Sequence, residues 1–364
     1  MNKKIGIITF HRAANFGAML QSFALKRSLQ ELGGDRTEII DYRASSIEKL
    51  YKYHWDYCFK DITLSFRSIK NVVGRLGYIS ILKKRLQNFR KFEKKYLSPS
   101  PKPYTDYDVI VFGSDQIWNV GITQNDDIFF GDIRTDKVKK VAYAGSLGHG
   151  DIDAFKSKVR LLKTFSAIGV RELQLISVFL ELGIDSFPCL DPTFLLTSDK
   201  WLKYLGLPQI TKKREKILLV YCIRDKERVL KAARPIAAKL GLNLVILESS
   251  ETIDVHGISK KATYYGPKEF VRCFNDADFV VTDSFHGTVF SILFHKTFVS
   301  CRLGDGRDGR AESLLSQIGL TTRLQYPEEI SSSSFTDIDF VFSDEKLNYL
   351  RTQSLRFLSE MVIN

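Results

Sequence analysis

The sequence predicts an α/β protein made of two Rossmann-like domains that face each other across a cleft. Short apolar runs of strand length alternate with helical stretches along the chain, which is typical of a parallel sheet covered by helices. The alternation starts afresh after a segment rich in Pro and charge near the middle of the 364 residues. A chain of this length accommodates two domains of ordinary size.

The first domain is expected over residues 1–190. Its buried strands are predicted within residues 3–10, 37–42, 107–119, 138–148 and 165–173. Its helices are predicted over residues 19–32, 152–164 and 172–182, and two glycines end the first of them.

The second domain is expected over residues 191–342. The connection between the two domains is expected at residues 187–215, across their boundary. Its strands are predicted within residues 215–223, 242–249, 278–285 and 297–303. Its helices are predicted over residues 226–240, 267–277, 289–294 and 310–319, and a C-terminal helix follows at residues 343–364.

The net charge of +12 is concentrated in residues 46–105, where fourteen Lys and Arg stand against four Asp and Glu. Aromatic residues are interleaved with these charges, and we predict a helical insertion. Three interpretations are open: nucleic-acid binding, a cationic surface that lies on an anionic membrane, and a solvated helical face. No nucleic-acid-binding motif accompanies the segment, so we expect no nucleic acid as partner. The aromatic content favours a membrane surface or an anionic lipid-linked acceptor.

Other patterns exclude several classes of protein. The five cysteines are far apart without a CxxC pair, and no apolar run approaches the ~18 residues of a membrane span. The N-terminus lacks the pattern of a signal peptide. We expect a reduced cytoplasmic protein, peripheral at the inner membrane face if the basic segment binds lipid. Neither half has GxGxxG after its first strand, and no compact His, Asp and Glu cluster predicts a metal site.

His286 stands where a predicted strand ends and a helix begins, which is where ligands of open α/β sheets bind. One interpretation is simple packing beside a helix cap supplied by Asp283 or Ser284. The strand-end position, the adjacent Gly287 and the basic cluster that follows favour a general acid or base. The helix N-terminus disfavours an imidazolium until an anion binds, so proton and anionic substrate would load together. This behaviour suits an acid that acts on an anion.

Arginines follow predicted strands in both halves. Arg171 and Arg224 come directly after strands, and Arg307 and Arg310 lie in a glycine-rich turn. Any one of them is equally explained by a surface ion pair. Together they predict a small, strongly anionic ligand in the cleft, because guanidinium groups bind carboxylate and phosphate in a bidentate manner.

Two polar turns of the first half are candidates for binding a sugar. The residues concerned are His11, Asn15, Ser114, Asp115, Trp118 and Asn119. Backbone amides of the Ser114 turn and the carboxylate of Asp115 would bind sugar hydroxyls, and Trp118 would stack on a sugar face. A tight turn with a core tryptophan explains the same residues equally well.

Several of these stretches, in this order, resemble the polysaccharide pyruvyl transferase family. The matching stretches cover roughly residues 1–325 and read "GIITFHRAANFGAMLQSFAL", "YDVIVFGSDQIWN", "VAYAGSLG", "GVRE", "CLDPTFLL", "TDSFHGTVFSILFHKTFV" and "RAESLLSQIGL". The resemblance implies a fold similar to that of GT-B glycosyltransferases. It also implies transfer of pyruvate from phosphoenolpyruvate, as co-substrate without a further cofactor, onto two hydroxyls of one sugar. The product would be a cyclic ketal on a capsular or exopolysaccharide unit. Two forms of the acceptor stay open, a free saccharide and a saccharide attached to undecaprenyl diphosphate.

The resemblance assigns the catalytic histidine to His286. Ser284 and Gly287, on either side of it in the strand-end loop, are expected to bind the donor. Related members have Arg-Leu before this histidine, whereas this chain has Ser284-Phe285. The anion-binding role of that arginine must therefore pass to Arg171, Arg224, Arg307 or Arg310. Two rival functions are a GT-B glycosyltransferase that uses a nucleotide sugar and a non-catalytic protein of the same fold that binds glycan or lipid.

Overall fold

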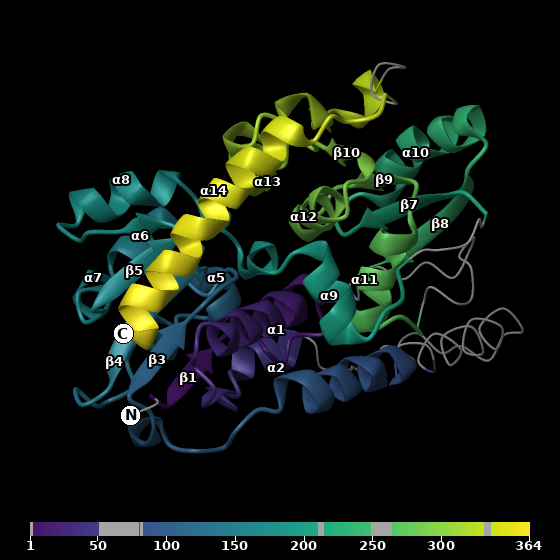
Figure 1. Cartoon of the computed structure of the whole chain (residues 1–364). Helices are drawn as coiled ribbons and strands as arrows, with labels where there is room; N and C mark the ends of the chain where they lie inside the picture. Colours follow the sequence, from purple (N-terminus) through teal and green to yellow (C-terminus); the bar gives the residue numbers. More distant parts are fainter. Residues whose placement is uncertain (1–2, 51–79, 81–82, 210–214, 249–263, 331–335) are drawn as a thin grey trace, which may run out of the picture.

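The computed structural model describes residues 3–50, 80, 83–209, 215–248, 264–330 and 336–364. Within them the chain forms two separate parallel sheets (Figure 1). The first sheet has the order β2-β1-β3-β4-β5-β6, with strands β1 (Ile5–Ile8), β2 (Thr37–Ile39), β3 (Val109–Phe112), β4 (Lys139–Gly145), β5 (Ala167–Val170) and β6 (Phe187–Pro188). The second has the order β11-β10-β9-β7-β8, with strands β7 (Ile217–Cys222), β8 (Asn243–Glu248), β9 (Phe279–Thr282), β10 (Thr297–Cys301) and β11 (Leu324–Gln325). The predicted fold class is confirmed.

Helices pack beside the strands of the first sheet. They are α1 (Phe16–Glu31), α5 (Val120–Thr123), α6 (Ile152–Lys156), α7 (Val159–Leu162) and α8 (Gln174–Glu181). Helix α1 begins three residues before its predicted start because Asn15 caps it, its Oδ1 accepting from the amide of Ala18 at 3.2 Å. The single helix predicted over residues 152–164 is two short helices, α6 and α7, separated by a turn at Ser157 and Lys158.

Four helices accompany the second sheet. They are α10 (Lys226–Leu240), α11 (Pro267–Asp276), α12 (Phe285–Leu293) and α13 (Gly309–Gln317). Helix α12 starts four residues before the apolar run that predicted it, and this shift brings His286 into its first turn.

The segment predicted as a connection between domains is ordered structure over most of its length. It supplies strand β6 to the first sheet and continues through a 3₁₀ turn (Pro192–Leu195) into helix α9 (Ser198–Leu205). Trp201 of α9 is fully buried and packs on Phe23 of α1, 5.4 Å between ring centroids. The crossover between the sheets is therefore part of the core.

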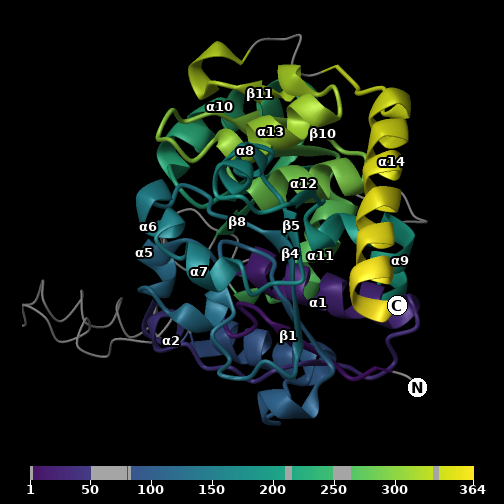
Figure 2. The same cartoon turned by 90° about the vertical axis from the view of Figure 1, so that its left-hand side faces the viewer.

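The C-terminal helix α14 (Val341–Leu358) starts two residues before its predicted start and runs from the second half of the molecule back to the first (Figures 1 and 2). Its Ser354 Oγ accepts from the amide of Leu190 at 2.9 Å, and Phe357 lies 6.2 Å from Tyr143 between ring centroids. At the end of the chain, the backbone oxygen of Asn364 accepts from Lys3 Nζ at 2.6 Å. The helix thus ties the two halves together.

Aromatic side chains form one continuous core between the two sheets. Phe16 of α1 stacks on Phe270 of α11 with 4.8 Å between ring centroids, and Tyr221 of β7 lies 5.0 Å from Phe270. The apolar cluster around them includes buried residues of both halves. The two sheets are therefore held at a defined separation next to the ends of their strands.

The described parts of the basic insertion are helix α2 (Ser45–Leu50) and a helix at residues 83–92, which ends in a π-helical turn (Glu93–Leu97). The latter helix contacts both halves. Phe89 lies 5.1 Å from Phe16 between centroids, and Asn88 Nδ2 donates to the backbone oxygen of Tyr264. The membrane-surface prediction was made for residues 46–105, of which residues 51–79 and 81–82 lie outside the described residues. Within the part of the chain that the structure describes, no helix is both long enough and apolar enough to cross a membrane.

Candidate active site

A cavity of about 310 Å³ lies between the carboxyl ends of the two sheets, where the fold rule for open α/β sheets expects a ligand. Loops that follow β1, β3 and β4 line one side, and loops that follow β7, β9 and β10 line the other. Its polar lining side chains are Asn15, Asp115, Gln116, His149, Tyr221, Arg224, Asp283, Ser284, His286, Arg307 and Arg310.

The loop that carries His286 is fixed by hydrogen bonds at the end of β9. Thr282 Oγ1 donates to the backbone oxygen of Tyr221 at 2.6 Å and accepts from the amide of Ser284 at 3.1 Å. The carboxylate of Asp283 turns away and accepts from three amides after β7, at 2.7–3.1 Å. Neither Asp283 nor Ser284 caps α12 through its side chain. The capping interpretation therefore does not explain these residues.

The imidazole of His286 reaches the first turn of α1 in the other half. A Cβ added at Gly17 would lie 2.0 Å from Nδ1, so only glycine leaves room for the ring. The side chain of His286 is 9% exposed, and Nε2 has no hydrogen-bond partner among the described residues. The nearest acid is Asp191, whose Oδ2 lies 3.7 Å from Nε2. His286 is thus buried yet borders the cavity.

This contact predicts that Gly17→Ala separates stability from activity. Alanine favours a helix over glycine by about 1 kcal/mol, which offsets part of the cost of about 1–3 kcal/mol for crowding the buried ring. The free energy of unfolding should therefore fall by no more than about 2 kcal/mol. The new Cβ displaces His286, and turnover should fall at least tenfold. Thermal unfolding and turnover of the purified variant check both effects. The control is Gly121→Ala in α5, where the nearest atom is 3.3 Å away. Equal turnover of wild type and Gly17→Ala would contradict the role of Gly17.

Arg171, predicted to bind the donor, is buried and committed to protein groups. Its Nη1 donates to Asp191 Oδ2 at 2.6 Å and its Nη2 to Ser146 Oγ at 2.7 Å. Although burial opposes it, the charges of Glu172, Asp191 and Asp115 raise its pKa further above the ordinary value. Arg171 does not line the cavity and builds the wall beneath it.

Arg224 lines the cavity but is also paired. Its Nη1 lies 2.7 Å from Asp305 and 2.9 Å from Asp308, and Nε donates to the backbone oxygen of Asp283 at 3.0 Å. These contacts hold the loop after β10 against the loop after β9. Two neighbouring carboxylates already neutralise this guanidinium.

Arg310, in the first turn of α13, has no hydrogen bond or ion pair among the described residues. Its guanidinium lies over the ring of Phe285, 5.4 Å from the centroid, and that of Arg171 lies 4.9 Å from the same ring. Burial and the charge of Arg171 lower the pKa of Arg310 to about 10, so the group is still protonated at neutral pH. The charges of three nearby carboxylates act in the opposite direction but do not offset these two causes. A charged guanidinium that borders a cavity and has no ion pair among the described residues is a candidate site for an anion.

Two more basic groups border the same region. Arg307 is half-exposed and 4.0 Å from Asp305. His149 comes from the loop after β4, across the cavity. Burial, followed by the charges of Arg307 and Arg310, lowers the pKa of His149. Of the four predicted donor arginines, the structure leaves Arg307 and Arg310 available, and it adds a neutral histidine from the opposite half.

Some of the predicted acceptor residues line the cavity, and others are buried or engaged in the fold. Asn15 and Asp115 line the cavity, although Asn15 also caps α1. Ser114 is buried beneath the cavity, and Asn119 caps α5 through the amide of Gly121 at 3.1 Å. Trp118 is fully buried between Phe155 and Phe179. It is the core tryptophan of the second interpretation and has no face free for a sugar.

Gly287 has a packing role: a Cβ there would lie 2.1 Å from Thr282 Oγ1, so glycine lets α12 pack closely on β9. It does not line the cavity, whereas Ser284 does. The sequence interpretation missed Gly17, Gln116, His149 and Asp191 as site residues. Gln116, His149 and Asp191 follow strand ends, and Gly17 lies in the first turn of the helix that follows β1; this position after a strand was the available signal.

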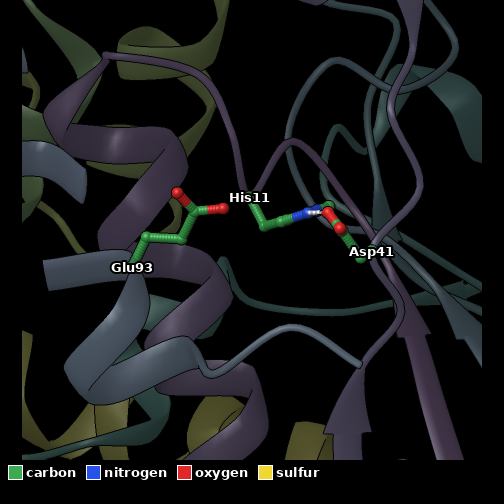
Figure 3. Close-up of side chains that lie close together, drawn as sticks. All are labelled: His11, Asp41 and Glu93. Atoms are coloured by element: carbon green, nitrogen blue, oxygen red, sulfur yellow. Dashed lines mark hydrogen bonds and ion pairs between the residues drawn. The ribbon is translucent and has the colours of Figure 1, made fainter. Parts of the chain in front are cut away.

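His11 lies outside the cavity in a polar cluster with Asp41 and Glu93 (Figure 3). One ligand atom from each lies within 4.8 Å of the others, a grouping that the sequence did not reveal. Arg12 Nη1 lies 3.3 Å from both Asp41 Oδ1 and Glu93 Oε1. The guanidinium thus supplies the positive charge between the carboxylates. Burial lowers the pKa of His11, whose Nε2 contacts Asp41 at 3.3 Å. The predicted role of His11 in binding a sugar has no support from this position.

Comparison with solved structures gives similar two-domain proteins. Staphylococcus aureus MnaA in complex with UDP is 13% identical with a TM-score of 0.49, covering 100% of this chain and 95% of its own. UDP-GlcNAc 2-epimerase from Neisseria meningitidis is 11% identical with a TM-score of 0.48, at 99% and 98% coverage. MurG from Acinetobacter baumannii is 10% identical with a TM-score of 0.41, at 99% coverage of both chains. A search among curated proteins finds no match.

Fold and site together define a two-domain α/β protein with an interdomain cavity that combines a buried imidazole with an arginine that has no ion pair among the described residues. The family model "Polysaccharide pyruvyl transferase" matches residues 15–304. The chain belongs to the polysaccharide pyruvyl transferase family.

Proposed function

We propose that this protein transfers the pyruvyl group of phosphoenolpyruvate to two hydroxyls of one sugar, forming a cyclic ketal and releasing phosphate. Family membership supports the class of reaction. The observation that carries the proposal is that His286 and the unpaired Arg310 share one interdomain cavity. An acid beside a cation suits protonation of an anionic enol ether.

The donor would bind with its negative charges against the second half of the molecule. Arg310 and Arg307 offer guanidinium groups, and Ser284 offers a hydroxyl at the start of α12, which lacks a side-chain cap. These groups replace the arginine that related members carry two residues before the histidine. Arg171 and Arg224 would act indirectly, by holding the walls of the cavity in place.

In the reaction, the imidazolium of His286 gives its proton to the methylene carbon of phosphoenolpyruvate. The electrons of the C=C bond form the new C–H bond, which leaves an oxocarbenium-like centre at C2. One sugar hydroxyl attacks C2, and loss of phosphate lets the second hydroxyl close the ring. The two sugar hydroxyls lose one proton each. One of these protons returns to His286 and replaces the proton given to the methylene carbon, and the other leaves on hydrogen phosphate. Arg310 would stabilise the charge on the departing phosphate.

The acceptor would occupy the side of the cavity formed by the first half. The polar groups there are Asn15, Asp115, Gln116 and His149, beside the apolar Phe10, Ile47 and Ile122. We propose a saccharide of a capsule or exopolysaccharide pathway, carried on a lipid diphosphate at an anionic membrane surface. No cofactor enters this proposal.

Calorimetry with phosphoenolpyruvate, UDP and inorganic phosphate tests the donor. Selective binding of phosphoenolpyruvate, followed by acceptor-dependent release of phosphate, is the expected result. Binding of UDP without binding of phosphoenolpyruvate would replace this proposal with a glycosyltransferase that uses a nucleotide sugar. Donor binding without turnover on any acceptor saccharide would favour a non-catalytic binding protein.

A further inference from the structure

The environment of His286 contains one close negative charge. Asp191 Oδ2 lies 3.7 Å from Nε2, and this carboxylate belongs to the crossover between the two sheets. A buried ring nitrogen without a hydrogen bond is costly unless a charge or a ligand compensates it. At 3.7 Å the contact is a charge interaction and is longer than a normal hydrogen bond. Catalytic contacts of this kind commonly shorten when substrate binds.

Asp191 is held rigidly. Its Oδ1 accepts from the amide of Thr193 at 3.0 Å and from Thr193 Oγ1 at 2.6 Å, and its Oδ2 accepts from Arg171 at 2.6 Å. The side chain is 1% exposed. Burial alone would raise the pKa of this carboxyl, but His286, Arg171 and Thr193 hold it well below its ordinary value. The carboxylate therefore stays ionised at neutral pH.

The other charged or titratable groups around His286 are engaged elsewhere or lie farther away. Asp283 binds three amides, Arg171 binds Asp191, and Arg310 lies over Phe285. Asp115 lies 3.9 Å from Arg171, and Tyr221 borders the cavity. Helix α1 approaches the ring through Gly17, which has no side chain. Among the described residues, Asp191 is the sole acid within 4.0 Å of the imidazole.

We propose that Asp191 is the positioning residue of His286: its carboxylate orients the ring across the domain boundary and holds a proton on Nε2. Since Arg171 of the first half also binds this carboxylate, Asp191 couples the wall of one half to the acid of the other. Nδ1, on the side of Gly17, is then the second nitrogen of the imidazolium. The positioning of the ring does not depend on the proposed function. Only the use of the proton in the transfer of the pyruvyl group rests on it.

Titration of His286 by NMR tests the proposal without any substrate. One of the six histidines is assigned by its loss in His286→Asn. An opposite charge this close favours the charged form by about one pH unit or more, so Asp191→Asn should lower the pKa of His286 by that amount. Since the protonated ring is the acid, the alkaline limb of the pH–rate profile should move to lower pH by the same shift.

Asp344→Asn is the matched control, because Asp344 Oδ1 lies 3.0 Å from Nε2 of the exposed His295. It should leave the titration of His286 unchanged. Asp191→Glu, which keeps the charge, should restore most of the His286 titration. An unchanged pKa of His286 in folded Asp191→Asn would overturn the proposal.

If Asp191→Asn does not fold, a measurement on the wild-type protein still tests the proposal. Long-range ¹H–¹⁵N spectra identify the tautomer of neutral His286, and the proposal requires the proton on Nε2. The Nδ1-protonated tautomer would overturn it. A shifted titration in a protein that does not turn over phosphoenolpyruvate would instead reject the proposed function and leave the Asp191–His286 pair standing.

Discussion

His286→Asn should abolish most turnover while it leaves the binding of phosphoenolpyruvate nearly intact. General acid catalysis contributes about 10²–10⁴-fold to rate, and an asparagine side chain has no proton to give at neutral pH. The donor charges would still meet Arg310 and Arg307. We expect kcat to fall by about two to four orders of magnitude, with the donor Kd within about threefold of the wild-type value.

Steady-state kinetics and calorimetry of the same preparation measure both quantities. His295→Asn is the control, since that histidine is 55% exposed and pairs with Asp344 outside the cavity. It should keep turnover within about twofold, as most surface substitutions do. Near-wild-type turnover of His286→Asn would remove the histidine from the mechanism, whatever the affinity for the donor.

Arg310→Ala should have the opposite signature, a loss of donor affinity. A hydrogen bond to a charged group contributes about 1.5–3 kcal/mol, which corresponds to roughly 10- to 150-fold in Kd. The side chain has no protein ion pair to lose among the described residues, so the fold should tolerate its removal, apart from its contact with the ring of Phe285. Thermal unfolding should shift little.

Arg302→Ala provides the comparison within the same loop region. Arg302 pairs with Glu312 at 2.8 Å and does not line the cavity, so its removal should leave the donor Kd unchanged. Arg310→Lys should recover part of the affinity, because a lysine keeps the charge without the planar fork of the guanidinium. If the wild type and Arg310→Ala bind phosphoenolpyruvate with equal affinity, Arg310 does not bind the donor, and Arg224 or Arg307 would take that role.

The site depends on contacts between the two halves, and this explains why glycine matters at one position. Gly17 belongs to the first turn of α1, yet the group that needs its lack of a side chain is His286 of α12. The first half thereby limits where the acid of the second half can stand. Asp191, in the crossover, contacts Arg171 and faces His286. Relative movement of the halves would separate these groups.

The four arginines show that local sequence patterns locate candidate residues but do not predict their ion-pair partners. Arg171, Arg224, Arg307 and Arg310 look alike in sequence, since each stands in a polar turn after an apolar strand. What distinguishes them is the acid that each one meets. Asp191 lies 20 positions from Arg171, and Asp305 lies 81 positions from Arg224. A periodicity or a motif reports the local face of a helix or strand and contains no information about such partners.

Trp118 and His11 make the same point for the acceptor side. Both stand in turns that the strand-end rule selects. Trp118 instead fills the core between Phe155 and Phe179, and His11 contacts Asp41 outside the cavity. Position in a loop therefore narrows the choice of site residues, but the direction of each side chain depends on the packing around it.

The sequence by itself determined the alternation of strands and helices, the two parallel sheets and the strand-end loop that carries His286. These features follow from local physics: apolar runs bury as strands, and amphipathic stretches form helices. The tertiary structure alone decided that Arg310 has no ion pair among the described residues, that Gly17 makes room for the imidazole and that Asp191 faces it. These contacts join residues from different elements, and charge compensation and steric fit depend on distances that only the folded chain defines.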